Sequence, residues 1–398
     1  MPNILSLHGK GLKLNTRADI EPHLTEDPNT LEEIHLGGNT IGVEAAEALA
    51  EYLKKTQVLK VANFADIFTG RLISEIPQAL SAICDALIDK TSLVEINLSD
   101  NAFGGRSVDP MVPFLTHNRS FQILKLNNNG LGPEGGAVVA NALLQSALLS
   151  QKEGVESKLR TVICGRNRLE DGSAPVWGEA LKAHGRLTRI EMTQNGIKPD
   201  GISALVRGIA TCKSLVHLNL QDNTFGEKGS KTAAEALPSW PLLESLNFAD
   251  CVLAQEGEVS PVVPVLLAGS NPKLSVLQLA NNDFDTQSFD LFVEGIDEHL
   301  PALKTFEIYW NSFDEDDENI VSLGKTLKKR GGKLVVTDPD EEEDEDEEEE
   351  KAEEEDEKED EAPAPAVPVK EKGTFEKATD ALAEMLGNIS LSGSSQKE

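Results

Sequence analysis

The strongest candidate for chemistry in this sequence is a single cation, Arg71, which follows Gly70 at the end of the run DIFTGR (66–71). This run departs from a pattern that recurs along the chain, because it has Ile67 where most corresponding segments have asparagine. Glycine tolerates turn conformations that other residues avoid, so it can hold a neighbouring guanidinium out from a rigid edge toward a partner. An equally good interpretation of the pattern is a variant turn, with Arg71 solvated or paired with an acid.

Three further polar side chains lie next to the recurring asparagines. Asn128 directly precedes one of them, and Arg166 and Arg168 flank the next. An amide and two guanidinium groups at one edge could bind the polar surface of a partner protein. The alternative for Asn128 is a polar turn, and the alternative for the two arginines is surface charge paired with Glu170 or Asp171.

Signatures of a stand-alone enzyme are missing from the sequence. The seven histidines are scattered without an HExxH motif, and the run GPEGG (132–136) lacks the Lys-Ser/Thr of a phosphate-binding loop. The four cysteines show no CxxC spacing, which is typical of structural thiols in a reducing compartment. We therefore expect a protein that is no enzyme by itself and binds neither cofactor nor metal.

The candidate residues all lie on a repeated pattern, LxxLxLxxN, whose last position we call the slot. The ten slot residues are Asn39, Ile67, Asn101, Asn129, Asn167, Asn195, Asn223, Cys251, Asn282 and Asn311. Most neighbouring slots are 28 residues apart, which leaves room for a strand and a helix in each repeat. The sequence therefore predicts an α/β leucine-rich-repeat solenoid, a horseshoe of the ribonuclease-inhibitor type.

The pattern predicts the role of the apolar and polar side chains within each repeat. The strand leucines should point into the core between strand and helix, and the slot asparagine should satisfy backbone groups where the chain leaves the strand. Because repeats bury their faces only against neighbours, the array needs caps, which we expect at residues 5–14 and 320–336. Longer slot intervals indicate insertions at 71–90 and 150–157, expected as loops.

The predicted repeat domain covers residues 1–337, and a different composition follows. Residues 338–361 contain 20 Asp and Glu against two Lys, too little apolar surface to fold, so we expect a disordered acidic region. A Pro-rich linker at 362–372 and a disordered tail at 392–398 flank a segment, 373–391, with apolar residues on one helical face. That segment predicts either a weakly populated helix or a short helix that docks to a partner.

The net charge argues against nucleic acid as a partner. The formal net charge is -31, and since phosphate contacts need a surplus of Lys and Arg, nucleic acid is not expected. The N-terminus lacks the charged-then-apolar pattern of a signal peptide. No apolar run approaches the roughly 20 residues that span a bilayer. These features predict a soluble, intracellular protein.

Several runs resemble the GTPase-activating proteins of the small nuclear-transport GTPase Ran. They are LGGNTIG (36–42), DIFTGR (66–71), LSDNAFG (98–104), NNGLGP (128–133) and ICGRNRLE (163–170), and the acidic run after the last repeat matches as well. The envelope-targeting domain of plant members and the large C-terminal domain of vertebrate members have no counterpart here. We therefore expect a short soluble form of the fungal or protist type.

The resemblance implies acceleration of GTP hydrolysis on Ran, in trans. In the family, the arginine matching Arg71 is essential, yet it is thought not to enter the nucleotide site as an arginine finger does. The activator is instead thought to order the GTPase's own catalytic glutamine, and the asparagine matching Asn128 is placed near that glutamine. Arg71 and Asn128 are therefore the expected catalytic residues of the activator, while GTP and Mg²⁺ belong to the partner.

The resemblance also suggests a wider partner-binding set. Arg166 and Arg168 would contact the GTPase or support the edge internally, and Asp66 and Asn39 complete the set. A purely structural role is the alternative for Asn39. The expected partner is Ran-GTP, with or without a Ran-binding protein, and the expected state is a monomer. The expected location is the cytoplasm, with a perinuclear position as the alternative.

Two other functions remain open at this point. An acidic leucine-rich-repeat chaperone for histones or other basic proteins would also join repeats to an acidic tail. A ribonuclease-inhibitor-like binder would share the repeat length, but that family is rich in cysteine, and this chain has four. The acidic run itself either attracts a basic face of the GTPase, solubilises the chain, or binds basic proteins.

Overall fold

The computed structural model describes residues 2–255, 257–314 and 316–339. The compact unit of the chain runs from Met1 to Asp338. From Asp340 onward, the predicted acidic region (338–361), linker (362–372), helix (373–391) and tail (392–398) lie outside the described residues.

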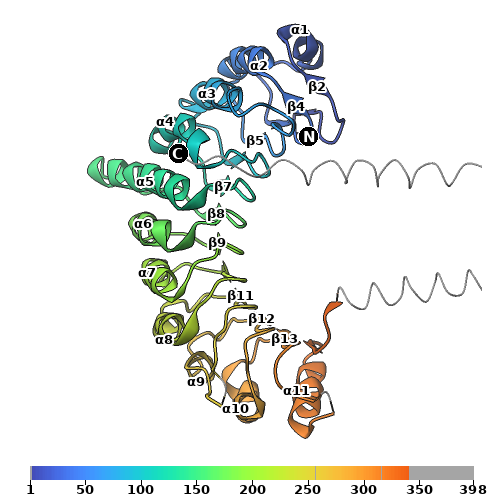
Figure 1. Ribbon diagram of the computed structural model, residues 1–398, viewed down its shortest axis with the longest axis vertical. Coiled ribbons are helices and arrows are strands. Elements are labelled where there is room, and N and C mark those ends of the chain that lie inside the picture. The colour runs from blue at the N-terminus through green and yellow to red at the C-terminus, as the bar shows by residue number, and fades with distance from the viewer. Residues whose placement is uncertain (1, 256, 315, 340–398) are drawn as a thin grey trace, which may run out of the picture. The chain divides into compact units, whose positions relative to one another are not determined.

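Parallel strands form the inner surface of this unit (Figure 1). Among the described residues, twelve strands make one sheet in chain order, and a second, two-stranded sheet lies near the N-terminus. The large sheet consists of β1 (Ile4–Ser6), β3 (Glu33–His35), β5 (Val61–Asn63), β6 (Glu95–Asn97), β7 (Ile123–Lys125), β8 (Thr161–Ile163), β9 (Arg189–Glu191), β10 (His217–Asn219), β11 (Ser245–Asn247), β12 (Val276–Gln278), β13 (Thr305–Glu307) and β14 (Lys333–Val335). The small sheet pairs β2 (Lys13–Leu14) with β4 (Thr40–Ile41).

Helices cover the outer surface of the unit and connect successive strands (Figure 1). The α-helices are α1 (Arg17–Ile20), α2 (Val43–Lys55), α3 (Ile76–Leu87), α4 (Val112–His117), α5 (Gly132–Lys152), α6 (Glu170–His184), α7 (Pro199–Ile209), α8 (Gly226–Ala236), α9 (Val262–Leu266), α10 (Thr286–His299) and α11 (Glu318–Lys329). Short 3-10 turns lie at η1 (Glu21–His23), η2 (Gly105–Ser107), η3 (Asp109–Met111) and η4 (Leu237–Ser239). The predicted leucine-rich-repeat solenoid is thereby confirmed.

The register of the sheet follows from the repeat. The central residue of each three-residue strand pairs with its equivalent in the next repeat, as Leu124 does with Ile96 and Val162. All three side chains are buried between the sheet and the helices. The apolar positions of the repeat therefore form one continuous core, and equivalent residues of neighbouring repeats lie side by side along the unit.

The slot asparagines form a ladder through the interior. Asn129 Nδ2 donates to the carbonyl oxygens of Leu126 and Leu98, both at 3.0 Å, and its Oδ1 accepts the backbone N–H of Asn101 at 2.9 Å. The backbone N–H of Asn129 in turn donates to Oδ1 of Asn167 at 3.0 Å. The prediction that these amides satisfy backbone groups at the end of each strand is confirmed, and each one also ties two repeats together.

Two expectations about insertions need correction. The segment at 150–157 was expected as a loop, but helix α5 runs on to Lys152, so much of the added length extends the helix. Helix α3 occupies much of the segment at 71–90, and the irregular part is the stretch before Ile76. The N-terminal cap, expected at residues 5–14, contains strand β1 and strand β2. Among the described residues, no helix is long and apolar enough to cross a bilayer.

Candidate functional site

A row of tight turns follows the strands, and three of the candidate residues, Asp66, Asn128 and Arg166, lie on it. The residue before each slot has a positive φ, which places its backbone in the left-handed region. We call these ten positions the turn row: Gly38, Asp66, Asp100, Asn128, Arg166, Gln194, Asp222, Asp250, Asn281 and Trp310. The backbone N–H of Asn128 donates to Gly165 at 2.9 Å, and that of Arg166 to Thr193 at 2.8 Å. These bonds stack the turns, so side chains of successive repeats are neighbours on one edge.

Arg71 is turned toward its own scaffold. Its Nε donates to Thr40 Oγ1 at 2.8 Å, and its Nη2 donates to the carbonyl oxygens of Thr40 at 2.9 Å and Leu14 at 3.4 Å. Within the described residues, Arg71 takes part in no ion pair, and the side chain is half-buried. The expectation that Gly70 holds this guanidinium out from the edge toward a partner is therefore wrong, and so is the alternative of pairing with an acid. The guanidinium instead fastens the loop after Ile67 to the two preceding repeats.

A glycine makes room for this contact. A Cβ atom at Gly42, directly before helix α2, would lie 3.1 Å from Nη1 of Arg71 and 2.8 Å from the carbonyl oxygen of Asn15. Gly70 has a φ of +78°, a conformation that lets the chain turn sharply into Arg71. The two glycines therefore serve the same contact, one by space and the other by conformation.

Asp66 supports the loop from its other side. Its carboxylate accepts a hydrogen bond from the Thr69 hydroxyl, and its backbone N–H donates to the carbonyl of Ser99 at 2.9 Å. Phe68, which lies between Asp66 and Thr69 in the sequence, is buried against Phe103 with ring centroids 6.0 Å apart. The loop that carries Arg71 is thus fixed by side chains at both ends and by an apolar contact in the middle.

Asn128 is exposed on the turn row, and a neighbouring carboxylate orients it. Its Nδ2 donates to Asp100 Oδ1 at 3.1 Å, one repeat earlier. Within the described chain, Oδ1 of Asn128 makes no hydrogen bond, so it is available as an acceptor. An equivalent pair lies farther along the row, where Asn281 Nδ2 donates to Asp250 Oδ1 at 2.7 Å. The same kind of pair thus occurs at two places on the turn row.

Arg166 and Arg168 extend from the same edge into solvent. Both have positive φ values, 56° and 52°, and both are exposed. No side-chain hydrogen bond or ion pair of either arginine is found in the described part of the chain. The proposed pairing with Glu170 or Asp171 is therefore wrong.

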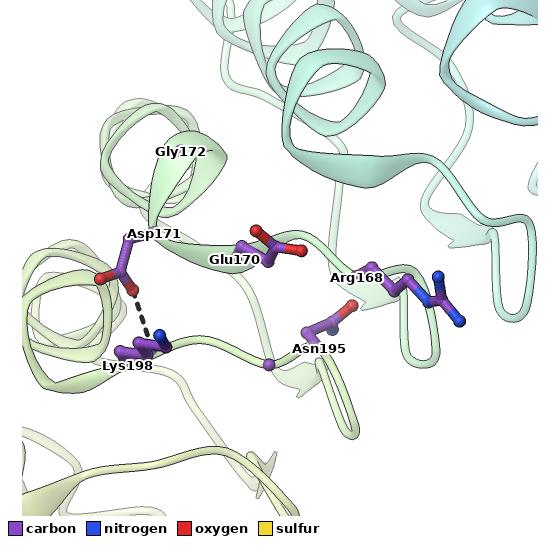
Figure 2. Close-up of a pocket in the computed structure, with 7 residues that line it drawn as sticks. Arg168, Glu170, Asp171, Gly172, Asn195 and Lys198 are labelled. Carbon is purple, nitrogen blue, oxygen red and sulfur yellow. Dashed lines mark hydrogen bonds between the residues drawn. The ribbon is translucent and has the colours of Figure 1, made fainter.

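Figure 2 shows how Arg168 lies relative to the two acids. The guanidinium of Arg168 extends away from Glu170, and Asp171 faces Lys198, whose backbone N–H donates to Asp171 Oδ1 at 2.8 Å. Between Arg168 and Lys198 lies an open hollow of about 420 Å³, lined by both acids and by Asn195. The hollow is open to solvent, and charged and amide side chains line it.

Asn39 belongs to the interior ladder. The side chain is 3% exposed, its Nδ2 donates to the carbonyls of Leu36 at 2.7 Å and Leu7 at 2.9 Å, and its Oδ1 accepts the N–H of Leu12 at 2.9 Å. These contacts favour the structural alternative for Asn39. It holds the turn from which the next residue, Thr40, reaches Arg71.

Sequence reasoning missed the residues that position the candidates. Thr40 and Gly42 hold Arg71 from 31 and 29 positions away, and Asp100 orients Asn128 from 28. The only signal was alignment of the repeats: Asp100 and Asn128 occupy the same repeat position one period apart.

The described residues contain no cluster of His, Cys, Asp and Glu that could hold a metal. Charged and amide groups thus lie together along the edge that the turn row forms.

Comparisons with known proteins agree with this architecture. A model described as "Leucine Rich repeat" matches residues 27–50, 117–140 and 211–231. The frog (Xenopus laevis) protein "Ran GTPase-activating protein 1" is 44% identical over 198 residues, 48% of this chain and 34% of its own length. The fly (Drosophila melanogaster) protein "Ran GTPase-activating protein" is 38% identical over 206 residues, 50% of this chain and 35% of its own length.

The yeast (Saccharomyces cerevisiae) protein "Ran GTPase-activating protein 1" matches over a longer region. It is 39% identical over 328 residues, which is 79% of this chain and 80% of the yeast protein. The aligned length is thus comparable to the whole repeat unit, Met1–Asp338. On this similarity and the repeat architecture, the chain belongs to the Ran GTPase-activating protein family.

Proposed function

We propose that this chain accelerates GTP hydrolysis by the small GTPase Ran, as an activator that acts in trans. Family membership carries this proposal, and the turn row supports it because it offers a continuous polar edge to a protein partner. The chain acts as a catalytic activator and not as an enzyme with its own substrate pocket. The GTP and its Mg²⁺ belong to the GTPase.

Arg71 acts in this proposal by fixing the edge. Its Nε and Nη2 are occupied by Thr40 and Leu14, so insertion into a nucleotide site would break three hydrogen bonds. An arginine finger gains its effect by placing a free guanidinium on the phosphates. The contacts of Arg71 therefore support a different role, in which the residue holds the loop 66–71 in the shape that the GTPase binds.

Asn128 is the residue we place against the GTPase's own catalytic glutamine. Asp100 accepts a hydrogen bond from one N–H of the Asn128 amide, which orients that amide. The Oδ1 atom and the second N–H of Asn128 are left for the partner. A hydrogen bond from Asn128 would hold the glutamine where it positions the attacking water. Such orientation can contribute several kcal/mol to the lowering of a barrier, with no proton transfer by the activator itself.

The remaining edge residues complete the interface that we propose. Arg166 and Arg168 contact the GTPase, because their guanidinium groups have no partner in the described part of this chain. Asp66 keeps the loop closed through Thr69, and Asn39 supports the turn of Thr40. We further propose that the chain works as a cytoplasmic monomer on Ran-GTP, with or without a Ran-binding protein.

A single-turnover assay tests this function. Ran loaded with radiolabelled GTP is mixed with catalytic amounts of this protein, and phosphate release is followed for wild type, Arg71→Ala and Asn128→Ala. We expect acceleration by several orders of magnitude for wild type and its near loss in both variants. If the wild type leaves the intrinsic rate of Ran unchanged, the proposed function is wrong.

A further inference from the structure

The segment directly after Arg71 exposes two large apolar side chains. Leu72 is 67% exposed and Ile73 is 64% exposed. These are the highest exposed fractions among the large hydrophobic residues in the described part of the chain, and the next is Trp310 at 53%. Isolated exposed leucines are common on protein surfaces, but two consecutive ones next to a candidate site require an explanation.

The exposure is built into the local structure. The backbone N–H of Leu72 donates to Glu75 Oε2 at 3.1 Å, and the N–H of Glu75 donates back to the carbonyl of Leu72 at 2.9 Å. This turn leads into α3, whose first residue, Ile76, is buried. In many helices an apolar residue just before the start packs down on the first turns. Here the turn holds Leu72 and Ile73 away from the core instead.

Arg71 connects this pair to the candidate site. Its three hydrogen bonds to Thr40 and Leu14 hold the start of the turn on the preceding repeats, and its backbone N–H donates to Phe68 at 3.0 Å. The two apolar side chains are thus carried by the same loop that begins at Asp66 on the turn row. Five residues separate Asp66 from Leu72 in the chain, so the apolar pair and the turn row belong to one continuous loop that a docking protein could contact as a whole.

We propose that Leu72 and Ile73 form an apolar anchor that packs against an apolar surface of the GTPase when it docks on the turn row. This inference rests on the proposed function and adds a specific docking contact to it. Arg71 then has a second role, because the guanidinium that fixes the loop also fixes the anchor. Burial of large apolar side chains lowers the dissociation constant without changing the chemistry of the bound complex.

The test compares Leu72→Ser/Ile73→Ser with wild type and with Val155→Ser. Val155 is 51% exposed in the segment between α5 and β8, so its substitution is a matched control for loss of surface apolar area. Affinity is measured with Ran bound to a non-hydrolysable GTP analogue, and kcat and KM by stopped-flow hydrolysis. A second double variant, Leu72→Met/Ile73→Val, keeps an apolar surface, and melting curves check that every variant is folded.

We expect about tenfold weaker binding for each serine substitution, and 30- to 100-fold for the pair, with a parallel rise in KM. The kcat at saturation should stay within about twofold, and the Met/Val variant and Val155→Ser should bind as wild type does. Wild-type affinity in the folded double serine variant would overturn the anchor while the activator function stands. Failure of the wild type to accelerate hydrolysis would overturn both.

Discussion

Replacement of Thr40 by valine tests whether Arg71 works through its own scaffold. Valine has nearly the shape of threonine but lacks the hydroxyl that accepts from Arg71 Nε at 2.8 Å. The bonds from Nη2 to the carbonyl oxygens of Thr40 and Leu14 remain. The substitution therefore removes one of the three hydrogen bonds that the guanidinium makes and leaves the other two in place.

The expected size follows from the contact. A hydrogen bond with a charged donor contributes about 1.5–3 kcal/mol in proteins, but Arg71 is only half-buried and solvent replaces part of it. We therefore expect the hydroxyl to contribute about 1 kcal/mol to the free energy that holds the loop in its active shape. Its removal should lower kcat/KM about fivefold. Thr224 occupies the same repeat position as Thr40 after its slot asparagine and is exposed, so Thr224→Val should leave kcat/KM unchanged.

A double-mutant cycle makes the test decisive. Single-turnover rates are measured for wild type, Thr40→Val, Arg71→Ala and the double variant. If the hydroxyl acts only through the guanidinium, Thr40→Val has no further effect once Arg71 is alanine. A wild-type rate for Thr40→Val beside a strong defect for Arg71→Ala would refute the reasoning, because Arg71 would then act on the partner directly.

Three further outcomes are expected. Asp100→Ala should lower kcat/KM about three- to tenfold in the hydrolysis assay because Asn128 loses its orienting acceptor, whereas Asp250→Ala at the equivalent pair should not. Asn129→Ala should lower the free energy of unfolding by about 2–4 kcal/mol in urea titrations, since it leaves ladder groups unpaired, while the exposed Asn128→Ala should change stability little. Burial lowers the pKa of His184, which lies between Ser157 and the carbonyl of Leu143, to about 4. The contribution of this buried, neutral imidazole to the free energy of unfolding is complete above the unfolded pKa near 6.5 and is lost as the pH falls toward 4. Urea titrations across this range should therefore show a decrease of about 2–3 kcal/mol that His184→Gln makes smaller.

The fold could be predicted because each repeat carries, in about 28 residues, the residues that its strand, turn and helix require. The spacing of leucines and slot asparagines at 28 residues predicts the strand, the turn and the helix together, and the ladder around Asn129 is the physical reason for the asparagine. The length of α5 was harder to predict, because a polar, helix-compatible stretch up to Lys152 reads equally well as an insertion loop.

The site was only partly predictable. Arg71 and Asn128 stand out by residue type, but what they contact depends on neighbours one repeat away. The alternative in which Arg168 pairs with Glu170 is wrong for a related reason. Both residues have a positive φ, so short sequence separation does not bring their side chains together. Contacts across repeats follow from the stacking of the turns, which becomes visible when the turn row is assembled in three dimensions.

The most direct measurement of the central claim couples Asn128 to the catalytic glutamine of Ran. Hydrolysis rates are determined for wild-type and Asn128→Ala activator, each with wild-type Ran and with Ran in which that glutamine is replaced by alanine. The account predicts a large defect from Asn128→Ala on wild-type Ran and almost no additional defect on the glutamine variant, because the amide acts through that glutamine. Equal defects on both forms of Ran would contradict it and place Asn128 in an independent role.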